Sequence, residues 1–123
     1  MTIYKVGIKL VKSSDIIFFR GNYAQYKLTV KRNSSAYDLS SPVSLALYVK
    51  RKVTEADGDA VITKTTGSGI SAGDATGIVT ITFDETDTEE LEIGFNFVYD
   101  IELTTASGKL ITILRGVFKL RQD

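Results

Sequence analysis

Apolar and polar residues alternate along most of this chain, and this alternation constrains the fold more than any other feature. It is clearest at 23–31, 42–50 and 77–83, where every second residue is apolar and most of those between are polar. A period of two places one set of side chains on each face of a β-strand. Because no helical stripe of useful length accompanies the pattern, the chain is predicted to be all β.

Turn residues separate the alternating stretches at short intervals. Clusters of Ser, Asn, Asp and Gly occur at 13–15, 33–35, 57–59, 67–69 and 72–77. A further alternating stretch at 4–10 and an apolar run at 16–20 add two candidate strands. About seven or eight short strands joined by tight turns are typical of an antiparallel sandwich or barrel. With 123 residues we expect one domain, 1–123, in which 1–15 is a strand-like N-terminal extension.

One short stretch departs from the strand pattern. In the sequence DETDTEEL at 84–91, Glu89 follows Thr86 by three residues, a spacing typical of a capping box. We expect a single helical turn there, with Leu91 docking it on the core.

Residues 94–123 form the best-defined element, a long β-hairpin. A two-residue turn at Ser107-Gly108 is predicted, because Gly accepts the positive φ that such turns need. The resulting register puts Asp100 opposite Arg115, a favourable cross-strand pair. Its core face consists of the pairs Phe95–Leu120, Phe97–Phe118, Tyr99–Gly116, Ile101–Leu114 and Leu103–Thr112. Its outer face consists of the pairs Asn96–Lys119, Val98–Val117, Asp100–Arg115, Glu102–Ile113 and Thr104–Ile111.

The outer face of this hairpin carries more apolar side chains than is usual for a solvent-exposed surface. Two interpretations stay open: either the strands fold over or the run at 16–20 covers that face, or the face meets another subunit, because contiguous exposed apolar patches are uncommon on monomers. An exposed N-terminal strand could also add to a neighbour's sheet through its unpaired backbone groups. The candidate interface residues are therefore Val98, Ile111, Ile113 and Val117, together with Tyr4, Val6, Ile8 and Leu10.

Most catalytic and metal sites cannot be built from these residues. The chain has no His and no Cys, which excludes Ser-His-Asp and Cys-His arrangements and zinc sites of imidazole or thiolate. Carboxylates cluster at Asp57 and Asp59 and again at 84–90, but both groups are typical of solvated turns and caps. The glycines at 67–69 precede no helix that could hold a phosphate. No catalytic residue, cofactor or metal is expected, and the chain is predicted not to be an enzyme.

Charge and hydropathy narrow the range of partners. Lys and Arg total 15 and Asp and Glu total 15, so the net charge is zero. This balance argues against nucleic acid and against membrane surfaces, both of which attract an excess of positive charge. No apolar run approaches the roughly 18 residues of a spanning helix, and the start lacks the apolar stretch of a signal peptide. We expect synthesis in a cytoplasm without signal-directed export.

Four segments in order resemble a known family. They are FFRGNYAQYKLTVK at 18–31, YDLSSPVSLALYVKRK at 37–52, GIVTITFDETDTEEL at 77–91 and the closing hairpin with its YDIEL strand. This order resembles the immunoglobulin-like N-terminal domain of upper baseplate proteins from tailed phages of Gram-positive bacteria. The resemblance covers 18–123, and Gly21-Asn22 stands where that family typically has Gly-Asp. It implies an immunoglobulin-like antiparallel β-sandwich.

The resemblance also implies a structural role in a virion. In that family the domain attaches to the tail apparatus, and a longer C-terminal part carries or recruits host-binding elements. The sequence reaches Asp123 without such a part, so an adaptor role is expected. The predicted function is a non-enzymatic tail or baseplate module, located in the virion, that docks other virion structural proteins and forms homo-oligomers.

Two alternative functions remain. One is a capsid decoration or head–tail joining protein, which would use the same kind of docking surface at another place in the virion. The other is a carbohydrate-binding module for host glycan, with Tyr23, Tyr37 and Tyr48 as candidate stacking platforms.

Overall fold

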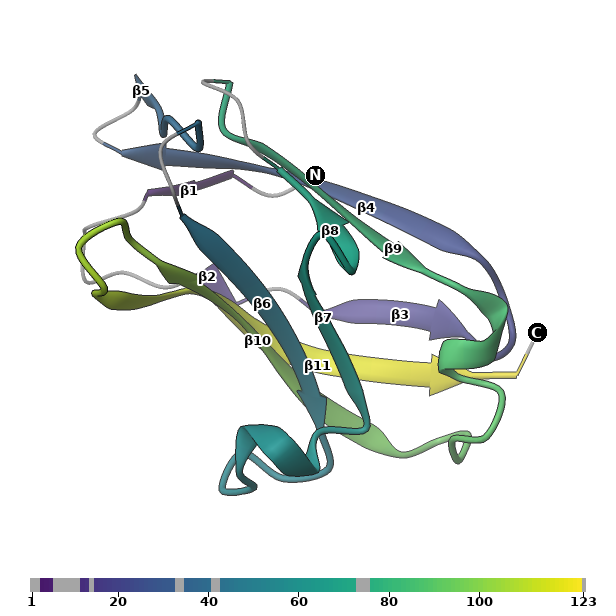
Figure 1. Ribbon diagram of the computed structural model, residues 1–123. Helices are drawn as coiled ribbons and strands as arrows, with labels where there is room; N and C mark the ends of the chain where they lie inside the picture. Colours follow the sequence, from purple (N-terminus) through teal and green to yellow (C-terminus); the bar gives the residue numbers. More distant parts are fainter. Residues whose placement is uncertain are drawn as a thin grey trace.

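Two layers of β-strands pack face to face around an apolar interior (Figure 1). The computed structural model describes residues 3–5, 12–13, 15–32, 35–40, 43–72 and 76–122. The first layer contains β1 (Ile3–Lys5), β4 (Ala24–Arg32), β5 (Ser35–Ala36), β8 (Gly69–Ser71) and β9 (Ile78–Phe83). The second contains β2 (Lys12–Ser13), β3 (Ile16–Phe19), β6 (Ser44–Lys50), β7 (Ile62–Thr66), β10 (Asn96–Thr104) and β11 (Leu110–Arg121).

The strand order makes the fold an immunoglobulin-like sandwich. Neighbouring strands follow the order β1-β4-β9-β8-β7-β6-β10-β11-β2, with β3 beside β11 and β5 beside β4. The pair β4–β9 and the trio β6–β10–β11 hold the places of strands B and E and of strands C, F and G in immunoglobulin domains. The short strand β8 pairs with both β7 and β9, so the two layers are joined along one side. The predicted fold class is confirmed.

The structure has more strands than the alternation predicts. Eleven strands occur within the described residues, and four of them (β1, β2, β5 and β8) are only two or three residues long. A segment as short as β2, β5 or β8 shows no more than one period of alternation, so it leaves no sequence signal. The pattern predicts the long strands β4, β6, β9, β10 and β11, the run at 16–20 corresponds to β3, and β1 overlaps the predicted strand at 4–10.

Aromatic rings from both layers meet in the interior. The ring centre of Phe18 lies 5.4 Å from that of Phe83 and 5.7 Å from that of Phe118. These separations are typical of favourable aromatic pairs. Phe18 comes from β3, so this early strand contributes directly to the core and is bound to the body of the sandwich.

The hairpin β10–β11 keeps the predicted register over half its length only. From Asn96 to Ile101 each residue lies opposite the predicted partner, including Asp100 opposite Arg115. Beyond this point the register shifts by one, so that Glu102 faces Thr112 and Leu103 faces Ile111. The turn causes the shift: Thr105 N–H donates to the Lys109 carbonyl at 2.8 Å, which leaves three loop residues instead of two.

A bulge restores the register farther along the strand. Gly108, with φ of 87°, closes the three-residue loop, and Ile113 is the extra residue that lies between the two registers. Such a bulge places two consecutive side chains on nearly the same side. Ile113 and Leu114 are accordingly both buried.

The predicted helical turn is present but is capped by other residues. A 3-10 turn, η2, spans Glu85–Asp87, and Leu91 packs against the core as expected. The capping carboxylate belongs to Asp87, which accepts the Asp84 N–H at 2.8 Å, so the prediction of Thr86 and Glu89 was wrong. A carboxylate can cap a turn as well as a hydroxyl can. The segment therefore allows a capping box at Asp84 and Asp87 as well as the predicted one at Thr86 and Glu89. The turn predicted at 57–59 is also a 3-10 turn, η1 (Asp57–Asp59), a helical form that the sequence does not predict.

Candidate docking surface

The structure separates the four predicted hairpin interface residues into two groups. Val98 and Val117 lie opposite each other on the outer face of the second layer and are half-buried. Ile113 is 3% exposed and belongs to the core, and Ile111 packs against the core from its rim. The prediction of Ile111 and Ile113 as outer residues was wrong because the three-residue turn and the bulge reverse their face. No local sequence signal marks this bulge.

The N-terminal candidates are only partly described. Tyr4 lies in β1, opposite Val30 of β4, in a parallel pair within the chain's own first layer. Val6, Ile8 and Leu10 lie outside the described residues. The proposed exchange or addition of this strand to a neighbour therefore stays a prediction.

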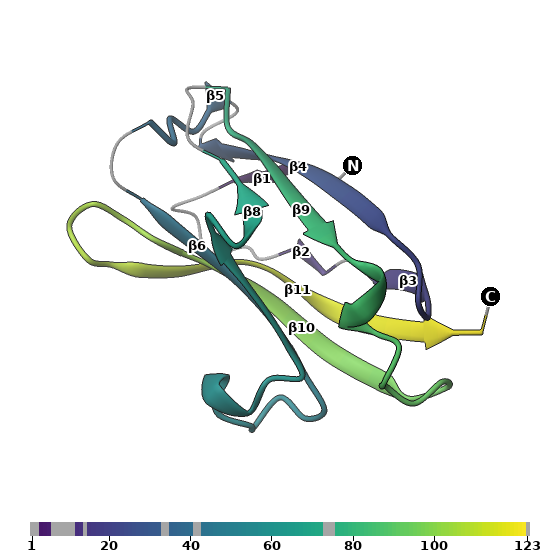
Figure 2. The same ribbon diagram turned by 45° about the vertical axis from the view of Figure 1, so that its right-hand side comes forward.

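The run at 16–20 extends the outer face of β10 and β11 instead of covering it. Its strand β3 lies parallel to β11 at the edge of the layer, with Ile17 opposite Lys119 and Phe19 opposite Arg121 (Figure 2). Ile16 and Phe18 are buried in the core, whereas Ile17 and Phe19 are 51% and 45% exposed. Together with Val98 and Val117 these two side chains form what we call the outer apolar patch.

Charged groups are interleaved with this patch. The Lys119 ammonium lies 3.6 Å from the Asp15 carboxylate, and Asp15 also accepts the Val117 N–H at 3.2 Å. Lys119 and Arg121 lie opposite Ile17 and Phe19, and Arg115 follows on the same face of β11. Apolar and charged side chains therefore alternate across this face.

A hollow of 190 Å³ opens on the same face beside Val98. Its lining includes Tyr48, Lys50, Val98, Asp100, Arg115 and Gly116. Within the described residues the buried Oδ1 atom of Asp100 has no hydrogen-bond partner. Burial raises the pKa of the Asp100 carboxyl above its ordinary value, although the nearby Lys50 charge opposes this effect. A buried acceptor without a donor is costly, so the hollow favours a ligand or partner that brings a donor.

Lys50 beside the hollow is already engaged. It is 8% exposed and donates to the Asp57 carboxylate at 2.6 Å, and this hydrogen bond raises the pKa of its ammonium. Its ammonium also lies 5.6 Å from the ring centre of Tyr48, in a cation–π contact. Burial, followed by the Asp100 charge, raises the pKa of Glu102. Within the described residues, Asp100 Oδ1 is the buried side-chain atom that lacks a hydrogen-bond partner.

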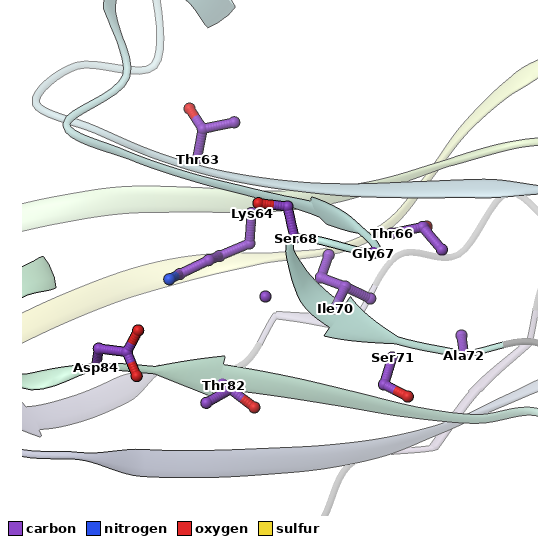
Figure 3. Close-up of a pocket in the computed structure, with 11 residues that line it drawn as sticks. Thr63, Lys64, Thr66, Gly67, Ser68, Ile70, Ser71, Ala72, Thr82 and Asp84 are labelled. Atoms are coloured by element: carbon purple, nitrogen blue, oxygen red, sulfur yellow. The ribbon is translucent and has the colours of Figure 1, made fainter.

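A second, larger hollow of 640 Å³ lies where the two layers part between β7 and β9 (Figure 3). Lys64 extends from β7 into this gap, and its ammonium pairs with the Asp87 carboxylate at 2.7 Å. Gly69, with φ of 95°, leaves room for the lysine, because a Cβ there would lie 2.3 Å from Lys64 Cδ. Hydroxyl groups of Thr63, Ser68 and Thr82 line the rest, and its one ammonium is already paired.

The three tyrosines considered for glycan stacking are not brought together. Tyr23 is 56% exposed in the turn before β4, Tyr37 packs against the core after β5, and Tyr48 lies on β6 under the Lys50 ammonium. Three platforms on three separate elements form no common stacking surface.

The described residues contain neither a metal-binding cluster nor a membrane-spanning helix. No group of three or more His, Cys, Asp or Glu side chains in this part of the chain could hold a metal ion. No helix in the same part is long and apolar enough to cross a membrane.

Comparison with known proteins assigns no family to the chain. No family model matches it, and no curated protein matches it. Among solved structures, the ZIG-8–RIG-5 IG1–IG1 heterodimer aligns over 97% of this chain and 91% of the matched chain, with a TM-score of 0.49 and 13% identity. At this level of similarity the match carries no functional information.

Proposed function

We propose that the chain is a non-enzymatic structural module of a phage virion, belonging to the tail or baseplate, that works by docking other proteins. The observation that carries the proposal is the outer apolar patch, which lies on a sheet face that no described strand covers. Such a patch favours association, because apolar side chains gain free energy when a partner removes them from water. The virion setting is supported by the sequence resemblance to upper baseplate domains.

The docking mechanism follows from the order of groups on this face. A partner would bury the outer apolar patch and would also meet Lys119 and Arg121, which lie on β11 between the patch residues of β3 and β10. A donor group from the same partner could enter the hollow and satisfy Asp100 Oδ1. Specific assemblies typically bury about 800 Å² on each partner, so the contact must extend beyond the patch itself.

The test is whether the chain enters virions through this face. Phage particles assembled with the wild-type chain should contain it, and particles assembled with Val117→Asp should contain at least about tenfold less, as a charge in an apolar contact is costly. Thr80→Asp, on the outer face of β9 in the other layer, is the matched control and should enter normally. Mass spectrometry of purified virions measures the content, and separated tails and capsids distinguish the tail from a capsid location. Absence of the wild-type chain from virions would contradict the proposal.

A second prediction tests whether Ile113 belongs to the core and Val117 to the outer apolar patch. Ile113→Ala removes core volume and should lower the free energy of unfolding by about 3 kcal/mol. Val117→Ala, on the opposite face of the same strand, should lower it by less than about 1 kcal/mol. Urea unfolding followed by tyrosine fluorescence measures both. Equal effects would show that the bulge does not separate the two faces.

A further inference from the structure

Among the described residues, β3 has a strand partner on one side only, so it is an edge strand of this part of the sheet. It pairs in parallel with β11 from Phe118 to Arg121, and within the described residues β11 is its only strand partner. Both views show β3 lying along β11 at the border of the second layer (Figures 1 and 2). An edge of this kind presents backbone donors and acceptors that can template another strand.

The backbone bonds of β3 show which residues face the free side. Arg20 N–H donates to the Arg121 carbonyl at 2.9 Å, so Arg20 directs its backbone toward β11. Alternate residues of a strand direct their backbone groups to the same neighbour. Ile17 and Phe19 consequently direct theirs away from β11, and the Phe19 carbonyl accepts Asn22 N–H at 3.2 Å in the following turn. The N–H and C=O of Ile17 and the N–H of Phe19 are left to face the free side.

We propose that this edge pairs with the β3 edge of a second copy of the chain, antiparallel and about a two-fold axis at Ile17. The two Ile17 residues would exchange both backbone hydrogen bonds, and each Phe19 N–H would reach the Asp15 carbonyl of the second copy. The same strand would thus serve both partners, as a two-fold interface requires. The inference deepens the proposed docking function by naming one partner of the outer apolar patch, because Ile17 and Phe19 belong to both.

The charges along β3 favour a second copy in this orientation. Asp15, whose side chain is 50% exposed, lies at the start of the strand. Arg121 lies opposite Phe19 near its end, on the same face as Asp15, whereas the Arg20 guanidinium lies 3.5 Å from the Leu91 carbonyl. Antiparallel pairing brings Asp15 of one copy toward Arg121 of the other, whereas parallel pairing brings like charges together.

The area available makes this contact weak when it acts alone. A four-residue edge offers much less than the roughly 800 Å² per partner of a stable interface. We therefore expect a monomer–dimer equilibrium with a Kd on the order of 100 µM, and tighter pairing wherever docking holds copies close together.

Cysteine cross-linking tests the register directly, because the chain contains no Cys of its own. Opposite residues of a hydrogen-bonded antiparallel pair have Cα atoms about 5.5 Å apart, within the range that a disulfide spans. Ile17→Cys at about 100 µM should form a covalent dimer under mild oxidation at least about tenfold faster than Ile78→Cys. Ile78 is the matched control, since it is an apolar strand residue, 44% exposed, on the other layer. Equal rates for the two variants would overturn the proposal.

A second measurement keeps the test independent of thiol chemistry. The mass of the unmodified chain by light scattering should rise toward that of a dimer as its concentration approaches about 1 mM. Ile17→Lys should remain a monomer over the same range, whereas Ile78→Lys should associate as the wild-type chain does. A wild-type chain that stays monomeric refutes the pairing even if virions contain it. Dimers of a chain absent from virions refute the virion role alone.

Discussion

Two stretches of strand edge among the described residues, one on β7 and one on β3, are built differently. At the first, β8 pairs with only Thr65 and Thr66 of β7, so the earlier part of β7 borders the hollow with Lys64 inside it. At the second, β3 ends the other layer with Ile17 and Phe19 directed outward. One edge therefore holds an inward charge, and the other displays apolar side chains.

The difference bears on which edge can take a partner. An inward-pointing charge is a known protection of sheet edges, because a strand added there would bury an ammonium away from its partner. Lys64 is 9% exposed and depends on Asp87 for compensation, so any strand that displaced Asp87 would be penalised. The described residues of β3 contain no such charge. We therefore infer that the β3 edge is the one that can pair with a partner.

The largest expected effect comes from breaking the charge pair at the protected edge. Asp87→Asn leaves the Lys64 ammonium nearly buried without its carboxylate, and should lower the free energy of unfolding by about 2 to 3 kcal/mol. We expect the lower part of the range for buried pairs because the Asp87 side chain is 21% exposed. Asp15→Asn is the same chemical change at the other edge. It should cost less than about 1 kcal/mol, since Asp15 and Lys119 are 50% and 35% exposed.

Urea unfolding of both variants at neutral pH measures the comparison. Adding Lys64→Met to Asp87→Asn should recover most of the lost stability, because an apolar side chain needs no counter-charge. The double variant should also self-associate on heating, as its edge has lost the inward charge. If Asp15→Asn and Asp87→Asn proved equally costly, the two edges would not differ in the way described.

Most of the fold was predictable because the long strands carry their own signal. From Phe97 onward β10 alternates between buried and partly buried residues, as the sequence predicts, whereas Phe95, predicted to continue the core face, is 37% exposed just before the strand. Asp100 opposite Arg115 was likewise predictable from charge. The short strands β2, β5 and β8 were not, because their pairing is decided by neighbours distant in sequence.

The candidate site was predictable only in part. One additional residue in the hairpin loop explains much of the error in the predicted faces. A three-residue turn after Thr105 in place of a two-residue turn moves Ile111 and Ile113 from the outer face to the core. In a hairpin the side-chain period is two, so a slip of one residue reverses every face until a bulge corrects it. Ile17 and Phe19 were missed as surface residues because an uninterrupted apolar run does not show which members face inward.

The smallest expected effect concerns pH and the hollow beside the outer apolar patch. Burial raises the pKa of both Asp100 and Glu102 in the folded chain. A carboxyl whose folded pKa is raised binds protons more tightly when folded, so its contribution to stability increases as pH falls from neutral through the raised pKa toward the ordinary value, roughly pH 4. Glu92 shifts the opposite way, because Arg51 lowers its pKa, so the effect must be isolated by difference.

The effect of these two carboxyls is isolated by comparing the wild-type chain with the double variant Asp100→Asn, Glu102→Gln. Neither substituted side chain can titrate. The stability of the wild-type chain relative to this variant should rise as pH is lowered from 7 to 4, by less than about 1 kcal/mol because both groups are only partly buried. Urea midpoints at several pH values measure it. Filling the hollow with a docking partner that donates to Asp100 should reduce the raised pKa and flatten the profile, because a hydrogen bond to the charged form favours ionisation. A profile that stayed unchanged in the complex would mean that the partner does not reach Asp100, and that the hollow lies outside the contact.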